Sequence, residues 1–235
     1  MDAPPRATDV LVPAGTRLLH VGAQKTGTTA IQASLVAARD ELPAQGVRVI
    51  GRERQPDHAV LAVLGRPTAA GTPPPSPALW DQLVGRFRSA GEPRTILSEE
   101  NLSFAGPATI ARIVRDLDPE RVRVVVTLRH IARILPSHWQ QSVQVGITDD
   151  LDAWLRTVFD RFDGARPHPF WQGQRQDKLV AGWAEAVGAD RLTVVAVDEG
   201  GRARLQGCRR PGACSPRFRE ASTCGEPSRQ GSAEA

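Results

Sequence analysis

The first 200 residues of this 235-residue chain contain no cysteine, because Cys208, Cys214 and Cys224 all follow them. A cysteine-based zinc cluster and a catalytic thiol are therefore excluded from that part of the chain. No apolar run approaches the ~20 residues that cross a bilayer. The first ten residues also lack the basic start and apolar stretch of a signal peptide. We therefore expect a cytoplasmic protein without a membrane span.

Lysine is almost as scarce, since only Lys25 and Lys178 are lysines among 30 basic residues. The formal charge of +4 lies in residues 201–235, which hold seven Arg and three Glu, whereas residues 1–200 hold 23 basic and 23 acidic residues. A neutral body removes the general argument for a nucleic-acid footprint, so we expect no nucleic-acid partner. Its ligands must be inferred from local sites.

Residues 1–200 carry the alternating patterns of an α/β domain. Strands are expected near 17–21, 47–50, 95–98, 121–128 and 192–197, and helices near 28–42, 78–89, 108–117, 137–143, 151–162 and 178–187. Strands that alternate with helices indicate a parallel sheet with helices on both faces, in three layers. In such a sheet, ligands bind at the carboxyl ends of the strands.

Residues 201–235 differ sharply from this domain. They are rich in Arg, Gly, Pro, Ser and Cys and have few periodic apolar residues, a composition that predicts disorder. The change also suggests the hypothesis of a Gly/Arg-rich coding region read out of frame. Resequencing the gene would test it, and an intact frame would refute it.

A glycine-rich loop, HVGAQKTGTT over residues 20–29, joins the first predicted strand to the first predicted helix. Gly22 and Gly27 allow a tight turn, and the backbone N–H groups at the helix start point outward at its positive end. Lys25 adds a full positive charge, and the threonine hydroxyls that follow add donors. The loop therefore predicts a phosphate or sulfate site.

The loop differs from a Walker A motif, in which lysine follows the second glycine and a Ser or Thr then holds magnesium. Thr28 occupies the lysine position here, and the lysine has moved inside the loop. The central strand ends in Arg129 and His130, without a carboxylate for magnesium. A P-loop nucleotide kinase or NTPase stays an alternative, with Asp198 as its candidate carboxylate. A glycine turn that only packs strand on helix is the alternative without a ligand.

A second anion site is expected where the central strand ends. Arg129 needs a partner for its charge there, and Ser137 follows eight residues later, directly after Pro136. Because proline favours the first turn of a helix, we expect Ser137 at a helix N-terminus beside Arg129. The alternative is an arginine paired with a carboxylate and a serine that only caps a helix.

Together the two motifs resemble the cofactor-binding signature of the sulfotransferases that use 3′-phosphoadenosine 5′-phosphosulfate (PAPS), and the bacterial sulfotransferase-like proteins in particular. HVGAQKTGTTAIQ, residues 20–32, is similar to their 5′-phosphosulfate loop. VVVTLRHIARILPSHW, residues 124–139, is similar to their 3′-phosphate strand, turn and helix. The resemblance implies a P-loop-like α/β fold over residues 15–200. It also implies metal-independent transfer of a sulfuryl group from PAPS to a hydroxyl or amine.

The acceptor must lose a proton in that reaction. Ser98 to Asn101 resembles a Ser-x-Glu segment of the bacterial group, which points to Glu100 as the general base. Adjacent carboxylates face different ways, so at most one is expected in the site, and Glu99 and His58 remain the other candidates. Capping of a helix is the alternative role for either carboxylate.

The resemblance assigns the remaining roles residue by residue. Lys25 would contact the phosphosulfate and stabilise charge on the leaving phosphate, and Arg129 with Ser137 would hold the 3′-phosphate. The expected catalytic residues are Lys25 and Glu100, and the expected cofactor-binding residues are Gln24, Lys25, Thr26, Gly27, Thr28, Thr29, Arg129 and Ser137, with no metal.

Two departures from the family pattern limit these expectations. His130 stands where the family usually has Asp or Asn, and nothing matches the C-terminal Arg-Lys-Gly segment of cytosolic members. A truncated, non-catalytic sulfotransferase-like protein therefore stays an alternative. A small molecule, a carbohydrate and a lipid headgroup all stay open as the acceptor, and the sequence does not predict an oligomeric state.

Overall fold

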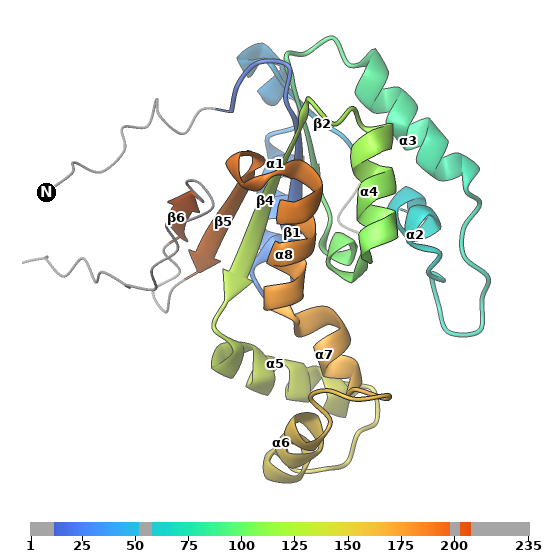
Figure 1. Ribbon diagram of the computed structural model, residues 1–235, viewed down its shortest axis with the longest axis vertical. Helices are drawn as coiled ribbons and strands as arrows, with labels where there is room; N and C mark the ends of the chain where they lie inside the picture. Colours follow the sequence, from blue (N-terminus) through green and yellow to red (C-terminus); the bar gives the residue numbers. More distant parts are fainter. Residues whose placement is uncertain (1–11, 52–57, 198–202, 208–235) are drawn as a thin grey trace, which may run out of the picture.

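One six-stranded sheet organises the computed structural model, which describes residues 12–51, 58–197 and 203–207 (Figure 1). The strands are β1 (Arg17–Gly22), β2 (Val47–Val49), β3 (Arg94–Ser98), β4 (Val122–Arg129), β5 (Leu192–Val197) and β6 (Ala203–Gly207). Their order is β2-β3-β1-β4-β5-β6. The first five strands run parallel, and β6 runs antiparallel to β5.

Helices fill the connections and cover both faces of the sheet. They are α1 (Thr28–Ala37), α2 (His58–Leu64), α3 (Ala78–Ser89), α4 (Pro107–Asp116), α5 (Ile131–Gln144), α6 (Leu151–Asp160), α7 (Pro169–Gln174) and α8 (Gln176–Val187), with the 3-10 helices η2 (Leu42–Gln45), η3 (Glu100–Phe104) and η4 (Ala189–Arg191). None of the helices in the described ranges has the length and apolar character to cross a membrane.

The layer order follows from the handedness of the crossovers. Connections between parallel strands are right-handed, so the direction of a crossover along the sheet decides which face its helix covers. The chain moves one way along the sheet from β1 to β2, through α1, and the opposite way from β3 to β4 and from β4 to β5. α1 therefore covers one face, and the helices of the later crossovers cover the other. Figure 1 shows α4 and α8 in front of the sheet and α1 behind it. The predicted three-layer α/β fold with a parallel sheet is confirmed.

The main hydrophobic core lies between the sheet and the helices α2, α3, α4 and α8. Leu19 of β1 and Val124 of β4 are buried in it, together with the large rings of Trp80 and Trp183. Trp80 keeps its polar atom satisfied, because its Nε1 donates to Asp116 Oδ2 at 2.9 Å. This core fixes β1 and β4 side by side, and their carboxyl ends then lie at one edge.

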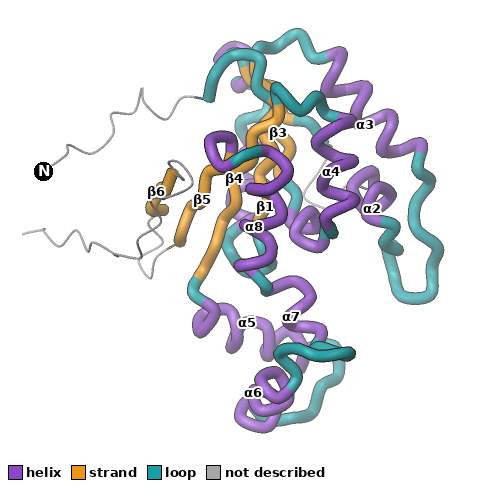
Figure 2. The backbone as a smooth tube through the Cα atoms, in the orientation of Figure 1, coloured by secondary structure: helices purple, strands orange, loops and turns teal. Residues whose placement is uncertain are grey.

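A second, smaller core joins α5, α6 and α7 beyond that edge (Figure 2). Ile134, Trp154, Val158 and Phe170 are buried in it, and the rings of Trp154 and Phe170 meet edge to face at 5.9 Å. Trp171 Nε1 donates to the Val158 carbonyl oxygen at 2.7 Å. These contacts hold α5 and α7 beside the carboxyl ends of the strands, where a parallel sheet binds its ligands.

Two helices, α2 and α7, have no counterpart in the sequence predictions. Residues 59–63, the middle of α2, are all buried, so the segment is apolar throughout and shows no 3.6-residue alternation. α7 has only six residues, too few for a periodic pattern. Both helices form because tertiary packing covers them.

α5 begins at Ile131, so the expectation of a helix N-terminus at Ser137 is wrong. His130 caps the helix directly after β4, because its Nδ1 accepts from the N–H of Ala132 at 3.2 Å. Pro136 then lies inside the helix, where it lacks one N–H donor. Burial of Ile134 in the second core stabilises the first turns despite that loss.

β6 lies inside residues 201–235, the segment whose composition predicts disorder. It pairs with β5 from Val197↔Ala203 to Thr193↔Gly207. The sheet therefore extends past the boundary expected at residue 200, because backbone pairing on an edge strand needs no apolar periodicity. Residues 208–235 lie outside the described residues.

Leu19→Ala should test the main core. Leu19 is fully buried at the centre of the sheet, so we expect its truncation to lower the free energy of unfolding by ~2–5 kcal/mol. Leu18→Ala is the matched control, because Leu18 is adjacent but only half-buried, and it should cost clearly less. Urea unfolding followed by circular dichroism measures both, and equal losses would contradict this assignment of the core.

Candidate functional site

The loop between β1 and α1 is tightly packed at Gly22, and two of its residues have a positive φ. A Cβ on Gly22 would lie 2.2 Å from Thr28 Cγ2, so no side chain fits there. Gly27 has φ +91°, in the left-handed region that costs glycine little. Lys25 has φ +69°, which is uncommon for a residue with a Cβ. The loop therefore presents the lysine at some cost in backbone strain.

The start of α1 offers backbone donors to a ligand. The Gly27 carbonyl oxygen accepts from the N–H groups of Ala30 at 3.1 Å and Ile31 at 3.3 Å, which begins the helix. Within the described residues, the N–H groups of Gly27, Thr28 and Thr29 have no protein acceptor. They lie at the positive end of the helix dipole, an arrangement that suits a phosphate or sulfate group.

A buried chain of hydrogen bonds fixes Thr26 beneath the loop. Thr26 Oγ1 donates to the Ala23 carbonyl oxygen at 2.7 Å and so accepts from Thr127 Oγ1 at 3.0 Å. Thr127 Oγ1 then accepts from His20 Nε2 at 3.3 Å, and His20 Nδ1 accepts from Ser98 Oγ at 2.6 Å. The Thr26 hydroxyl therefore points inward, which differs from the expectation that it would donate to the anion.

This chain requires a neutral His20. The ring lies 4% exposed in β1, and burial lowers its pKa to about 4. The ring is therefore uncharged near pH 7 and carries a single N–H, which the direction of donation assigns to Nε2. β1, β3, β4 and the loop are thereby joined without a buried charge.

Lys25 lines a pocket of about 270 Å³ with the loop and two side chains from distant elements. Glu100 comes from η3 and Gln141 from α5. Thr28 Oγ1 donates to Glu100 Oε2 at 2.9 Å, which holds the carboxylate toward the loop. We call this the Lys25 pocket, and it is lined by Gln24, Lys25, Gly27, Thr28, Thr29, Glu100 and Gln141.

The two adjacent carboxylates face different ways. Glu99 is 3% exposed, and its Oε1 accepts from the backbone N–H of Asn101 at 3.1 Å and from Asn101 Nδ2 at 2.8 Å. It thus caps η3, whereas Glu100 lines the Lys25 pocket. Of the two, the structure brings Glu100 to the loop.

Arg129 holds the loop from the end of β4. Its Nη1 donates to the Lys25 carbonyl oxygen at 3.2 Å, and its own carbonyl oxygen accepts from Gln176 Nε2 at 2.9 Å. Gln174 adds a second support, because its Nε2 donates to the Gln24 carbonyl oxygen at 3.0 Å. The loop backbone is therefore tied both to the sheet and to α7.

A mostly apolar pocket of about 560 Å³ has Arg129 in its wall. Leu128 and Ile131 line it from the end of β4 and the start of α5, and Val197 lines it from the end of β5. Arg129 lines this pocket and Lys25 lines the Lys25 pocket, so the hydrogen bond from Arg129 to the Lys25 carbonyl oxygen links a wall residue of each.

α5 turns one face to the loop although it does not begin at Ser137. Ser137 is half-buried in the second turn, so the helix amides are not available there. Gln141, four residues later on the same face, lines the Lys25 pocket. Burial and then the positive charge of Lys25 lower the pKa of His138. Ser137 therefore lies on the side of α5 that approaches the site.

The other predicted candidates lie elsewhere. His58 is the exposed first residue of α2 and does not line the Lys25 pocket. Asp198, the candidate carboxylate of an NTPase, lies outside the described residues. The described residues contain no group of three or more His, Cys, Asp and Glu side chains that could hold a metal ion.

Sequence reasoning missed the residues that support the loop from a distance. Gln141 and Gln174 carry no motif signal, since only the packing of α5 and α7 brings them to the loop. His20 and Thr127 had a weak signal, because each is a polar residue in a mostly apolar strand. Such residues in a buried strand indicate a polar network that needs partners.

His20 should make the stability of the fold depend on pH. Its folded pKa of about 4 lies below the ordinary value of 6.5, so the unfolded chain binds the proton more readily. Stability is therefore full above about pH 6.5 and falls by roughly 3 kcal/mol as the pH drops to about 4. In His20→Gln, this part of the pH dependence should vanish. Urea unfolding at pH 7.5 and 4.5 measures the free energy of unfolding of both proteins. A pH dependence in His20→Gln equal to that of the wild type would contradict this role of His20.

Comparison with models of known protein families finds no match, and comparison with curated protein sequences finds none. Among solved structures, the chain is similar to a sulfotransferase from Alicyclobacillus acidocaldarius, with a TM-score of 0.54 and 15% sequence identity. The similarity covers 77% of this chain and 72% of that one. At this identity it shows a shared, sulfotransferase-like fold.

Proposed function

We propose that this protein transfers a sulfuryl group from PAPS to a hydroxyl or amine of an acceptor. The observation that carries the proposal is the Lys25 pocket, where a lysine, the unbonded amides of α1 and a carboxylate surround one small volume. The sulfotransferase-like fold supports it. A small-molecule, carbohydrate or lipid acceptor would enter from the Glu100 side of the pocket.

The residues present fit a donor with two anionic ends. Lys25 and the amides of Gly27, Thr28 and Thr29 would hold the 5′-phosphosulfate. Arg129 uses one donor on the loop and, within the described residues, has no carboxylate partner, so its charge is left for a 3′-phosphate. The Ser137 hydroxyl would join it from the second turn of α5. The apolar pocket beside Arg129 offers room for the nucleoside.

Sulfuryl transfer requires the protein to position the donor and the acceptor and to stabilise the charge of the leaving phosphate. When bound, PAPS supplies a sulfuryl group attached to a phosphate that leaves with negative charge. Lys25 and the amides at the start of α1 would stabilise that charge in place. The proposal assigns this role to them rather than to a metal ion.

Glu100 would accept the proton of the acceptor. Thr28 occupies its Oε2, which fixes the carboxylate and leaves the other oxygen for the acceptor. Glu99 accepts hydrogen bonds from Asn101, and His58 does not line the Lys25 pocket, so both are weaker candidates for the base.

Adenosine 3′,5′-bisphosphate, the desulfated donor, should bind without magnesium. At about 100 times its Kd it should add about 2.7 kcal/mol of stability, seen as a rise in melting temperature. Stabilisation by ATP with magnesium, and none by the bisphosphate, would contradict the proposal and favour a P-loop kinase or NTPase. Bisphosphate binding without transfer to any phenol, alcohol, amine or sugar in a broad panel would favour a non-catalytic protein.

Lys25→Met should weaken binding of the bisphosphate about 10- to 100-fold, because a charge-assisted contact to the phosphate is lost. Transfer should slow further, since the lysine also stabilises the leaving group. Lys178→Met is the matched control, because it removes the only other lysine, and it should leave bisphosphate binding unchanged. Calorimetric titration measures both, and equal losses would argue against a specific role for Lys25.

Glu100→Gln should lower the transfer rate by about 10²- to 10⁴-fold while bisphosphate binding persists, because a general base is lost. Glu99→Gln is the matched control and should chiefly lower the stability of η3, by about 1 kcal/mol. Release of the bisphosphate from PAPS in the presence of acceptors measures the rate. Equal activity in the two variants would rule out a glutamate base.

A further inference from the structure

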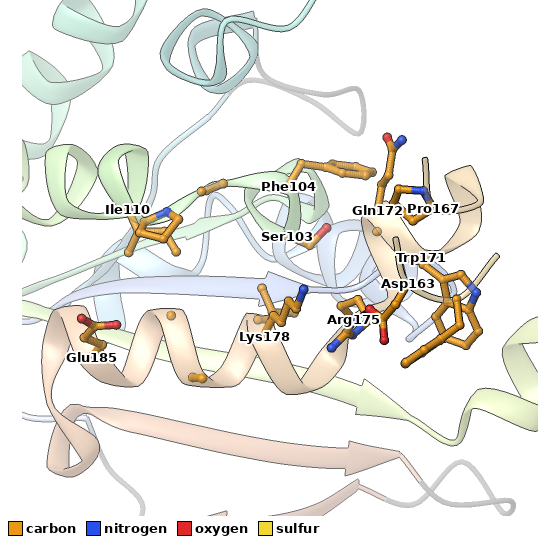
Figure 3. Close-up of a pocket in the computed structure, with 18 of the residues that line it drawn as sticks. Ser103, Phe104, Ile110, Asp163, Pro167, Trp171, Gln172, Arg175, Lys178 and Glu185 are labelled. Atoms are coloured by element: carbon orange, nitrogen blue, oxygen red, sulfur yellow. Dashed lines mark hydrogen bonds and ion pairs between the residues drawn. The ribbon is translucent and has the colours of Figure 1, made fainter. Parts of the chain in front are cut away.

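A second cavity, of about 540 Å³, lies between η3, the start of α4, α7 and α8 (Figure 3). We call it the α8 cavity. It shares no lining residue with the Lys25 pocket. Glu100 at the start of η3 lines the Lys25 pocket, whereas Ser103 and Phe104 at its end line the α8 cavity. Phe162, Trp171 and Arg175 also line the apolar pocket beside Arg129, so the α8 cavity is separate from the Lys25 pocket but shares a wall with that apolar pocket.

Apolar side chains form much of the wall. Phe104, Ile110 and Trp171 line the cavity, and Phe162 meets Trp171 edge to face with ring centroids 4.6 Å apart. Pockets for small molecules are typically ~300–1,000 Å³, with apolar and aromatic walls and a few polar groups. The wall therefore favours a flat apolar body such as an aromatic ring.

Glycines bring the walls together without filling the space between them. A Cβ on Gly173 of α7 would lie 2.9 Å from Phe104 Cε1, and one on Gly182 of α8 would lie 3.3 Å from Ile110 Cδ1. The close approach of α7 to η3 and of α8 to α4 thus depends on missing side chains. The cavity is a consequence of this packing.

Two polar groups that line the cavity have no partner within the described residues, the exposed Lys178 ammonium and the buried Ser103 hydroxyl. Figure 3 shows Lys178 extending from α8 toward η3, where Ser103 lies. Within the described residues, the Lys178 ammonium has no carboxylate partner. Ser103 Oγ is buried with no hydrogen-bond partner, which costs stability. An acidic group in the cavity would pair with the ammonium, and it would accept from the hydroxyl once the Ser103 side chain turns toward the cavity.

The other charges in the cavity sharpen this preference. Arg175 is already neutralised, because it donates to Asp163 Oδ1 and Asp177 Oδ2, each at 2.8 Å. That hydrogen bonding lowers the pKa of Asp177 to about 2, so its carboxylate stays charged. Glu185 lies two turns beyond Lys178 on the same face of α8 and would repel a second acidic group. Among the described residues that line the cavity, Lys178 is therefore the cation that remains for a ligand.

We propose that the α8 cavity binds a small aromatic compound with one acidic group. Its ring would lie against Phe104 and Trp171, and its acidic group would pair with Lys178 and the Ser103 hydroxyl. This site goes beyond the proposed sulfuryl transfer and does not depend on it. Aryl carboxylates and aryl sulfates share the required chemistry, and an aryl sulfate is what transfer to a phenol would produce.

Calorimetric titration of the full chain with naphthalene probes tests the proposal. The probes are 1-naphthoate, 1-naphthyl sulfate, neutral 1-naphthol and the cation 1-naphthylmethylammonium. We expect at least one of the two anions to bind about 10-fold or more tightly than 1-naphthol, because the anion alone forms charge-assisted contacts. The cation should not bind. Tighter binding of one anion shows whether the cavity prefers an aryl carboxylate or an aryl sulfate, and either result supports the proposal.

Three variants localise the binding. Lys178→Met should abolish the preference for anions while 1-naphthol still binds, and Lys178→Arg should restore it. Ser103→Ala should weaken anion binding several-fold without lowering the melting temperature, since its hydroxyl has no protein partner to lose. Circular dichroism checks that each variant folds.

Lys25→Met separates this proposal from the proposed function. It should weaken bisphosphate binding about 10- to 100-fold and keep the binding of 1-naphthoate or 1-naphthyl sulfate, whichever anion binds the wild type. Two results would overturn the proposal: no anion binding, or anion binding that survives Lys178→Met unchanged. Failure of the proposed function gives a different pattern, in which the bisphosphate does not bind and the anion does.

Discussion

The hydrogen bonds of buried His20 are the interaction on which the candidate site depends. Through Ser98 and Thr127 they tie β3, β1 and β4 together at the edge where all three strands end, and through Thr26 they hold the loop above them. A neutral ring serves here because it links hydroxyls without the cost of a buried charge. The loop can then present its amides and Lys25 from a rigid base.

The distribution of charge separates supporting residues from candidate binding residues. Arg48 pairs with Glu92, and Arg175 pairs with two aspartates, so these cations are neutralised by the protein itself. Within the described residues, neither of the two lysines has a carboxylate partner, and each lines a cavity. An unpaired cation beside an enclosed volume is the simplest physical sign of an anionic ligand.

Local sequence patterns predicted the features that depend on local interactions. The strand positions, the glycine loop and the α/β layers follow from apolar runs and from the glycines at 22 and 27, whose backbone limits act within a few residues. The predictions failed where packing overrides local preference. α2 is apolar on all sides, α5 starts at the cap made by His130 rather than at Pro136, and β6 pairs with the edge of β5.

The sequence by itself predicted a two-part anion site, from one rare lysine, a glycine loop and an arginine eight residues before a serine. Only the family resemblance favoured Glu100 over Glu99, because the sequence does not show in which direction each of two adjacent side chains points. The tertiary structure shows that the two carboxylates differ in position. The Thr28 hydroxyl donates to Glu100 in the Lys25 pocket, whereas Glu99 accepts from Asn101. The α8 cavity was likewise decided by packing, because its walls come from segments as far apart as Ser103 and Glu185, which only the folded chain brings together.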